Sequence, residues 1–285
     1  MITLANRNGS PHPSRIPVAF SIAGSDPSGG AGLQADLKTF CAFKVYGAAA
    51  VTAVTVQNTQ GVQAVLPLPG ALVREQLQAV LADLPVEAVK TGMLATAEIV
   101  RAVAETMACY PDRPLVVDPV AIASSGYALI DDQAWECLCS ELFPLAAVVT
   151  PNLPEAERIT GIRIRSRAEA WQAGRAILRT GARAVLIKGG HWSDRPSAGD
   201  VLIQDDRCLE LSQPWIATSA GHGTGCTLAA AIAAGLAKGG DLEQSVRTAK
   251  DYVSAALREA TAIGRGVHPL NHLAGVSSVW DLGRE

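Results

Sequence analysis

Two glycine-rich loops are the clearest places where this chain could bind an anion. The C-terminal loop, residues 221–227 (GHGTGCT), precedes the helical sequence LAAAIAAGLAKG, and the N-terminal loop, residues 23–32 (AGSDPSGGAG), opens another helix. Glycines allow backbone N–H groups to converge, and the first turn of a helix adds the positive end of its dipole. No Gly-Lys-Ser/Thr follows the C-terminal loop, which excludes a Walker-type P-loop.

Side chains in and after these loops leave alternatives open. Cys226 lies in the first turn of its helix, where the dipole favours a thiolate; a reactive thiol and a small buried side chain both fit. Asp36 lies at the edge of an apolar helix stripe and needs a partner, either through a structural hydrogen bond to the N-terminal glycine-rich loop or through a ligand. The motif at residues 30–35 fits a dinucleotide fingerprint, but residues 48–56 lack the acidic residue that a Rossmann dehydrogenase requires.

Polar residues follow several apolar, strand-like segments at the point where each segment ends. They are Lys90, Asp118, Asn152 with Glu155, and Lys188. The carboxyl ends of parallel strands meet at one edge of a sheet, so these side chains are expected to converge there. Carboxylates suit Mg²⁺ and a lysine suits phosphate, which indicates phosphoryl transfer. The amides at residues 57–60 suit the edge of a heterocycle, or form a polar loop.

The elements that must position these residues alternate between strands and helices. Strands are predicted at 17–23, 48–56, 86–91, 115–120, 147–150 and 184–188, with a hairpin over 200–212 turning at Asp205-Asp206. Helices are predicted at 31–44, 70–83, 96–109, 131–142, 153–160, 166–180, 225–237 and 242–263. Uniformly apolar strands separated by helices predict a mostly parallel sheet covered on both faces. We expect a flexible tail over 1–15 and a single α/β domain over 16–285.

Composition narrows the classes of function. The formal net charge of -3 disfavours nucleic-acid binding, which normally needs a basic surface. No apolar run reaches about 18 residues, so a membrane span is not expected. Six scattered cysteines without a CxxC pair fit a reduced, cytoplasmic protein.

The motifs, in their order along residues 17–272, resemble those of the hydroxymethylpyrimidine/phosphomethylpyrimidine kinases of the ribokinase-like superfamily. The segments that carry the resemblance are AGSDPSGGAGLQADLKTF (23–40), VTVQNTQGV (54–62), VKTGML (89–94), VVDPV (116–120), VVTPNLPEAE (148–157), VLIKGGH (185–191) and HGTGCTLAAAIAAGLA (222–237). The Gly-Thr-Gly-Cys sequence is typical of this branch, whereas most sugar kinases have Gly-x-Gly-Asp.

The resemblance implies a three-layer α/β/α domain, usually dimeric, that uses ATP and Mg²⁺. It implies phosphorylation of 4-amino-5-hydroxymethyl-2-methylpyrimidine, and then of its monophosphate, for thiamin biosynthesis. The pyrimidine pocket would be lined by Gly24, Asp36, Gln57, Met93 and Val120. Asp118, Asn152 and Glu155 would organise Mg²⁺ and phosphates, with Lys188 facing the phosphates. Gly223, Thr224 and Gly225 would form the anion hole, with Cys226 at the position of the sugar-kinase base.

Two departures from the family pattern bear on the reaction. The family often has Ala-Lys-Ser-Gly after Asp-Pro-Val, whereas this chain has Ser124 in place of the lysine, which leaves the second phosphorylation open. It also has Ala220-Gly221 where Asn-Thr is frequent. The alternatives are a pyridoxine/pyridoxal kinase on the same fold and a ligand-binding protein without catalysis.

Overall fold

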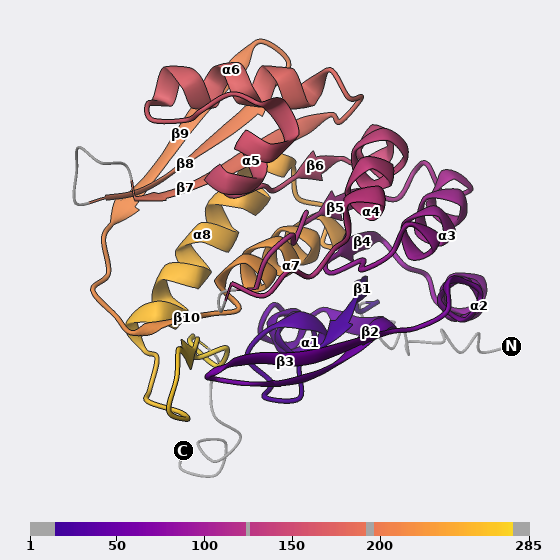
Figure 1. The fold of residues 1–285 in the computed structure, drawn as a ribbon. Helices are drawn as coiled ribbons and strands as arrows, with labels where there is room; N and C mark the ends of the chain where they lie inside the picture. Colours follow the sequence, from indigo (N-terminus) through magenta and orange to yellow (C-terminus); the bar gives the residue numbers. More distant parts are fainter. Residues whose placement is uncertain (1–14, 124–125, 192–196, 276–285) are drawn as a thin grey trace, which may run out of the picture.

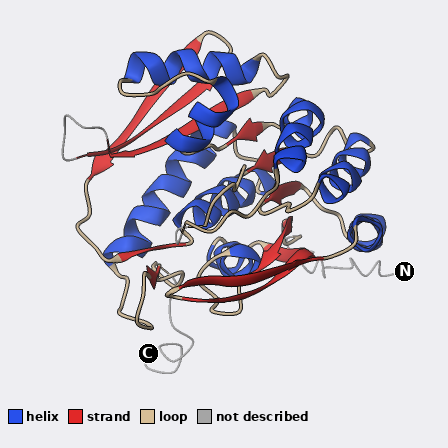
Figure 2. Cartoon of the chain, viewed as in Figure 1, coloured by secondary structure: helices blue, strands red, loops and turns tan. Residues whose placement is uncertain are grey.

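The computed structural model describes residues 15–123, 126–191 and 197–275, so the predicted tail lies almost wholly outside it. Nine strands form one sheet in the order β3-β2-β1-β4-β5-β6-β7-β8-β9 (Figure 2). The strands are β1 (Val18–Ser25), β2 (Tyr46–Asn58), β3 (Gly61–Pro67), β4 (Ala88–Thr91), β5 (Leu115–Val117), β6 (Val148–Val149), β7 (Ala184–His191), β8 (Ser197–Gln204) and β9 (Arg207–Pro214). Strands β2, β1, β4, β5, β6 and β7 are parallel, and β3, β8 and β9 are antiparallel additions at the edges.

Helices cover both faces of the sheet (Figure 1). One face carries α2 (Gly70–Asp83), α3 (Ala97–Ala108), α4 (Asp132–Cys137) with the turns η1 (Leu138–Leu142) and η2 (Phe143–Leu145), α5 (Leu153–Thr160) and α6 (Arg167–Leu178). The other face carries α1 (Gly32–Ala42), α7 (Thr224–Ala237) and α8 (Leu242–Arg258). Each layer buries its own apolar cluster against the sheet, which confirms the predicted three-layer α/β/α fold.

Side chains alternate between these two faces along each strand. In β1, Phe20 packs toward α2–α6, whereas Ala19 packs toward α1, α7 and α8. In β4, Val89 likewise packs toward α2–α6, and Ala88 packs toward α1, α7 and α8. This alternation decides which polar strand residues face α7.

The predicted elements are found, with several differences. The helix predicted over 131–142 is α4 followed by the π-helical turn η1, and the short strands at 220–222 and 268–269 were not expected. Strand β3 was not expected, although its alternating sequence pairs with β2 in an antiparallel ladder. Strand β5 ends at Val117 rather than at residue 120, since Pro119 has no N–H to donate to a ladder. The last helix ends at Arg258 instead of 263. The predicted hairpin is confirmed as β8 and β9, with Asp205 at φ 51 in the turn.

A short second sheet fixes the start of α7. It pairs β10 (Ala220–His222) with β11 (His268–Pro269) in parallel. No helix in the described part of the chain combines the length and the apolar character that a membrane span requires.

Candidate functional site

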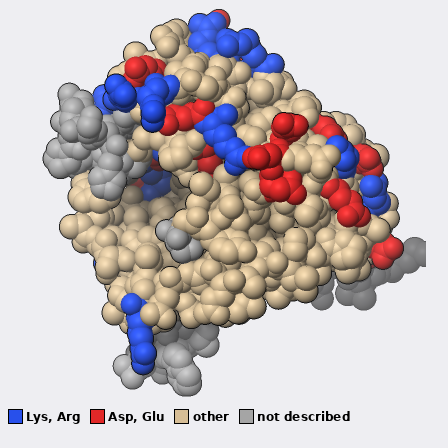
Figure 3. All heavy atoms as spheres, viewed as in Figure 1, with Lys and Arg blue, Asp and Glu red and all other residues tan. Residues whose placement is uncertain are grey.

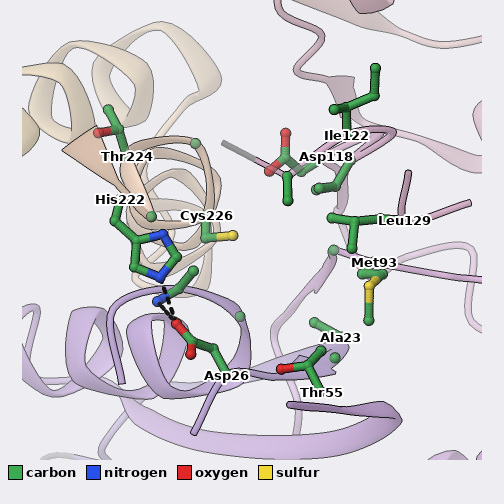
Figure 4. Close-up of a pocket in the computed structure, with 18 of the residues that line it drawn as sticks. Ala23, Asp26, Thr55, Met93, Asp118, Ile122, Leu129, His222, Thr224 and Cys226 are labelled. Carbon is green, nitrogen blue, oxygen red and sulfur yellow. Dashed lines mark hydrogen bonds and ion pairs between the residues drawn. The ribbon is translucent and has the colours of Figure 1, made fainter. Parts of the chain in front are cut away.

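A cavity of about 180 Å³ lies beyond the carboxyl ends of the central strands, between the two glycine-rich loops (Figure 4). Asp36 and Lys90, two of the residues expected at this edge of the sheet, are not part of its wall, but all the other predicted site residues are. The predicted residues in the wall are Gly24, Gln57, Met93, Asp118, Val120, Asn152, Glu155, Lys188, Gly223, Thr224, Gly225 and Cys226. Polar residues from distant strand ends therefore meet in one place, as the parallel topology predicts.

The C-terminal loop leads directly into α7 and leaves the first turn of that helix without a side-chain cap. Gly223 is the N-cap residue, has φ 84, and accepts a hydrogen bond from Thr227 through its carbonyl. The Thr224 hydroxyl donates to the carbonyl of Gly221 at 2.8 Å, so it does not cap the helix. Backbone N–H groups and the helix dipole therefore present a positive end to the cavity wall, which suits an anion.

The N-terminal loop is organised by the carboxylate of Asp26. One oxygen accepts hydrogen bonds from the backbone N–H and the hydroxyl of Ser28, at 2.9 and 2.7 Å, and the other accepts from the N–H of Ala31 at 2.8 Å. Burial alone would raise the pKa of Asp26, but hydrogen bonds from His222 and Ser28 lower it to about 2. The amides of Ser28 and Ala31 are thus occupied by an anion of the protein itself.

Asp26 and His222 join the two loops, and neither was predicted to be a site residue. His222 Nε2 lies 2.8 Å from Asp26 Oδ2, although the two residues are 196 positions apart in the sequence (Figure 4). The loops also touch through their backbones, since a Cβ added at Gly223 would lie 1.8 Å from the carbonyl oxygen of Gly30. The sequence offered one indication that Asp26 and His222 belong to the site, which is that both lie within the glycine-rich loops.

The wall of the cavity next to the N-terminal loop carries a side-chain amide. The carboxamide oxygen of Gln57 accepts from the Thr55 hydroxyl at 3.2 Å, and its nitrogen lies 3.4 Å from His222 Nε2. Met93 closes over Gly24, where an added Cβ would lie 2.3 Å from the methionine methyl carbon. A flat apolar surface beside a donor and an acceptor suits a small nitrogen heterocycle.

An acidic wall faces the C-terminal loop. Asp118 Oδ1 accepts from Lys188 Nζ at 2.7 Å and from the Thr150 hydroxyl at 3.0 Å. Glu155 and Asn152 form a capping box at the start of α5. Burial raises the pKa of Glu155 and Asp118 raises it further, although Lys188 opposes both. The same two carboxylates keep Lys188 charged, because they raise its pKa against the effect of burial.

This donor set fits magnesium bound mainly by water and phosphate. Two buried carboxylates, Asp118 and Glu155, share one ammonium, so additional positive charge would be stabilised there. In the described part of the chain no group of three His, Cys, Asp or Glu side chains is placed to hold a metal ion. Mg²⁺ is commonly held by one or two carboxylates together with water and substrate phosphates, which is compatible with this arrangement.

For the Cys226 thiol the sequence left a reactive group and a small buried side chain both open. Its sulfur points into the cavity (Figure 4), but burial raises the pKa of the thiol to about 11, even though Lys90 and a backbone hydrogen bond at Gly32 lower it. The thiol is therefore neutral near pH 7 in the absence of substrate. The helix dipole that suggested a thiolate is outweighed by desolvation.

Asp36 lies behind the cavity wall, not in it. It is fully buried, pairs with Lys90 Nζ at 2.8 and 3.0 Å, and accepts from the Ser21 hydroxyl. The role is structural, but the partners are Lys90 on β4 and Ser21 on β1 and not the glycine-rich loop that the sequence suggested. Ser124 lies outside the described residues.

A second cavity, of about 420 Å³, lies on the other side of the C-terminal loop. Its wall is mostly apolar and includes Trp215, Ile216, Leu228, Val253 and Leu257. It shares Asn152, Lys188, Gly221, Thr224 and Gly225 with the first cavity. Figure 3 shows a hollow in the surface of the molecule.

Most charged side chains on the face drawn in Figure 3 lie away from the surface formed by β2 and β3.

Comparisons with known proteins agree with this geometry. The family model described as phosphomethylpyrimidine kinase matches residues 26–271. Proteins similar to this chain include two named hydroxymethylpyrimidine/phosphomethylpyrimidine kinase. The Rhizobium meliloti protein is 50% identical, over 90% of this chain and 96% of that protein. The Haemophilus influenzae protein is 46% identical, over 92% of this chain and 98% of that protein. The thiamine biosynthesis bifunctional protein ThiED of Geobacter sulfurreducens is 46% identical over 92% of this chain, which spans only 53% of that longer protein.

Solved structures give the same fold. Bacillus subtilis pyridoxal kinase in an ADP complex has a TM-score of 0.84 at 36% identity, covering 91% of this chain and 98% of that one. The pyridoxal kinase of Staphylococcus aureus with AMP-PCP and pyridoxal has a TM-score of 0.83 at 35% identity, covering 91% and 95%. Phosphomethylpyrimidine kinase from Clostridium difficile has a TM-score of 0.75 at 42% identity, covering 84% and 98%. The chain belongs to the phosphomethylpyrimidine kinase family of ribokinase-like enzymes.

Proposed function

We propose that this chain transfers the γ-phosphoryl group of ATP to the hydroxymethyl oxygen of 4-amino-5-hydroxymethyl-2-methylpyrimidine, and then to the monophosphate, in thiamin biosynthesis. The observation that carries the proposal is the junction of two cavities at the C-terminal loop. One cavity presents the amide of Gln57 and the other is mostly apolar, so an acceptor ring and a nucleotide base can approach the same loop from two sides. The relatives named for this activity support the choice of acceptor.

The residues at the junction suit phosphoryl transfer. The hydroxymethyl oxygen attacks the γ-phosphorus and gives up its proton, while the bond to the bridging oxygen breaks and ADP leaves. The amides of Gly223, Thr224 and Gly225 stabilise the charge on the transferring group, and the Lys188 ammonium does so from the strand opposite. Magnesium, when bound near Asp118 and Glu155, would neutralise phosphate charge.

Cys226 is the side chain proposed to accept the hydroxymethyl proton. Only its thiolate can do so, and the thiolate is the minor form because the pKa of the thiol is about 11. Turnover that depends on this group should therefore rise with pH across the neutral and alkaline range.

The acceptor is tested by measuring ADP release with the free pyrimidine, its monophosphate and pyridoxal as separate substrates, each with and without Mg²⁺. We expect Mg²⁺-dependent turnover with the pyrimidine. Turnover with pyridoxal alone would instead favour the pyridoxal kinase activity named for the Bacillus subtilis and Staphylococcus aureus structures. Pyrimidine binding without ADP release would favour a non-catalytic binding protein.

The monophosphate arm of the same assay decides the second phosphorylation. Relatives named for both steps favour it, whereas Ser124, where the family often has lysine, removes a cation that could bind the substrate phosphate. We expect the second step to have the higher KM. An identical KM for both acceptors would show that other groups bind that phosphate.

We also propose that the protein is a homodimer that pairs through the outer face of β2 and β3. Val54, Val56 and Leu66 are 47%, 55% and 67% exposed there, on the face opposite Thr55 and Gln57. Residues 45–73 contain no charged residue, so a second copy can pair with the same surface without like-charge repulsion. Val54→Lys/Val56→Lys should convert a dimer to a monomer in light scattering; a wild-type monomer would contradict this.

A further inference from the structure

A fully buried ion pair lies directly beneath the acceptor cavity and has no part in the function proposed so far. Lys90 and Asp36 both have zero exposure, and Lys90 Nζ lies 2.8 and 3.0 Å from the two carboxylate oxygens. Ser21 donates to the same carboxylate at 2.5 Å. Moving two charges out of water is expensive, and a buried ion pair is weak evidence for stability by itself. A contribution to the neighbouring site is therefore worth seeking.

The fold brings this pair toward Cys226. Alternation along β4 directs Lys90 to the sheet face covered by α1 and α7, because Ala88 faces that layer and Val89 the other. Helix α7, which carries Cys226 in its first turn, packs on α1, β1 and β4, the three elements that supply Asp36, Ser21 and Lys90.

A glycine lets the ammonium approach the cavity. A Cβ added at Gly92 would lie 2.9 Å from Lys90 Nζ, and Gly92 itself lines the cavity. The Lys90 ammonium therefore lies against the backbone of a residue of the cavity wall. Its long side chain ends under the cavity floor rather than at the protein surface.

The charges around Cys226 come from several elements. Lys90 on β4 is the group that most lowers the pKa of the thiol, whereas Asp36 on α1 and Asp118 after β5 raise it. Reciprocally, Cys226 contributes to raising the pKa of Lys90, as it does for Lys188 on β7. Burial opposes the thiolate, so the fixed charge of Lys90 has a large influence on it.

We propose that Lys90 is a positioning residue of the kinase, a buried positive charge that stabilises the thiolate of Cys226, and that Asp36 holds Lys90 in place instead of contacting the substrate. This inference rests on the proposed role of Cys226 as proton acceptor. No covalent step is added: Lys90 keeps its protons, and Cys226 gains a proton when the hydroxymethyl oxygen loses one.

The test measures the reactivity of Cys226 itself in the whole, ligand-free protein. Iodoacetamide alkylation is followed peptide by peptide with mass spectrometry between about pH 7 and pH 10, since only the thiolate reacts. Lys90→Met/Asp36→Asn removes both charges of the pair. We expect Cys226 to react about threefold or more slowly in this variant at pH 8. The exposed Cys109 and Cys208 provide internal references and should keep their rates.

A second buried pair supplies the matched control. Lys250 and Asp200 are joined at 2.5 Å beside the other cavity, and neither is among the main causes of the shifted pKa of Cys226. Lys250→Met/Asp200→Asn should leave Cys226 alkylation unchanged. An unchanged Cys226 rate in the Lys90 variant, or equal slowing in both variants, overturns the inference.

The experiment also covers a double variant that does not fold and a wild-type protein that phosphorylates no pyrimidine. If the double variant does not fold, Lys90→Met alone is used, because burial already raises the pKa of Asp36 and the carboxyl takes a proton once the ammonium is gone. If Cys226 alkylation slows but the wild-type protein phosphorylates no pyrimidine, the charge relation holds and the proposed function fails.

Discussion

The two glycine-rich loops have similar composition, yet the structure uses them differently. In the N-terminal loop, the carboxylate of Asp26 accepts from the amides of Ser28 and Ala31. In the C-terminal loop, Gly223 provides no side-chain cap for α7. One loop is therefore closed by an internal anion, and the other presents its amides to the cavity.

The difference shows that a cluster of glycines does not identify an anion site by itself. What decides is whether the protein supplies its own acceptor for the converging N–H groups. Here Asp26 does so in one loop and also holds His222 of the other, at 2.8 Å. The N-terminal loop therefore helps to hold the C-terminal loop in position through this contact.

The largest expected effect follows from Gly223→Ala. The residue has φ 84, and an added Cβ would lie 1.8 Å from the carbonyl oxygen of Gly30, so the loop must move and its amides lose their alignment. We expect kcat to fall by about 100-fold or more, measured by ADP release.

Gly239→Ala is the matched control for that variant. Gly239 follows the other end of α7, has φ 80, and has nothing within 4 Å of an added Cβ. It should lose about 1 kcal/mol of stability and keep its kcat. Similar kcat losses in the two variants would show that backbone strain, not loop alignment, is responsible.

A smaller effect is expected from Cys226→Ala, which leaves the amides of the open loop in place. We expect kcat to fall by about 10-fold to 100-fold with little change in the KM for the pyrimidine, because a proton acceptor acts in the transition state. In the wild type, kcat should rise toward pH 11, since the pKa of the thiol is about 11. A pH-independent kcat, or unchanged turnover in the variant, would assign proton removal to another group.

The smallest expected effect concerns the closed loop. The folded-state pKa of Asp26, about 2, lies below its ordinary value of 3.8, so its contribution is present above about pH 4 and is lost as pH falls toward 2. We expect Asp26→Asn to lower the free energy of unfolding by about 2 kcal/mol at pH 6. That difference, measured by urea unfolding, should shrink below pH 4; Asp206→Asn, at an exposed turn residue, should show none.

Much of the architecture and of the acceptor cavity could be predicted from the sequence. Alternating strands and helices give the order of elements, and parallel strands bring Asp118, Asn152 and Lys188 to one edge of the sheet. Helix α2 was predicted with the bounds that the structure shows, Gly70–Asp83. The local sequence pattern is sufficient to predict the position of a residue when that position depends on a single helix or strand.

The rest depends on contacts between distant segments. The pairing of Asp26 with His222 joins residues 196 positions apart, and that of Lys90 with Asp36 places a predicted substrate ligand behind the wall. The neutral state of Cys226 follows from burial, which outweighs the helix dipole. Neither burial nor long-range pairing can be read from local spacing.

The most direct test of the contrast between the loops is the backbone amide NMR spectrum with and without a non-hydrolysable ATP analogue and Mg²⁺. We expect large shifts for the amides of Gly223, Thr224 and Gly225, and small shifts for those of Ser28 and Ala31, which Asp26 already binds. Large shifts at Ser28 and Ala31 with none in the C-terminal loop would contradict this expectation.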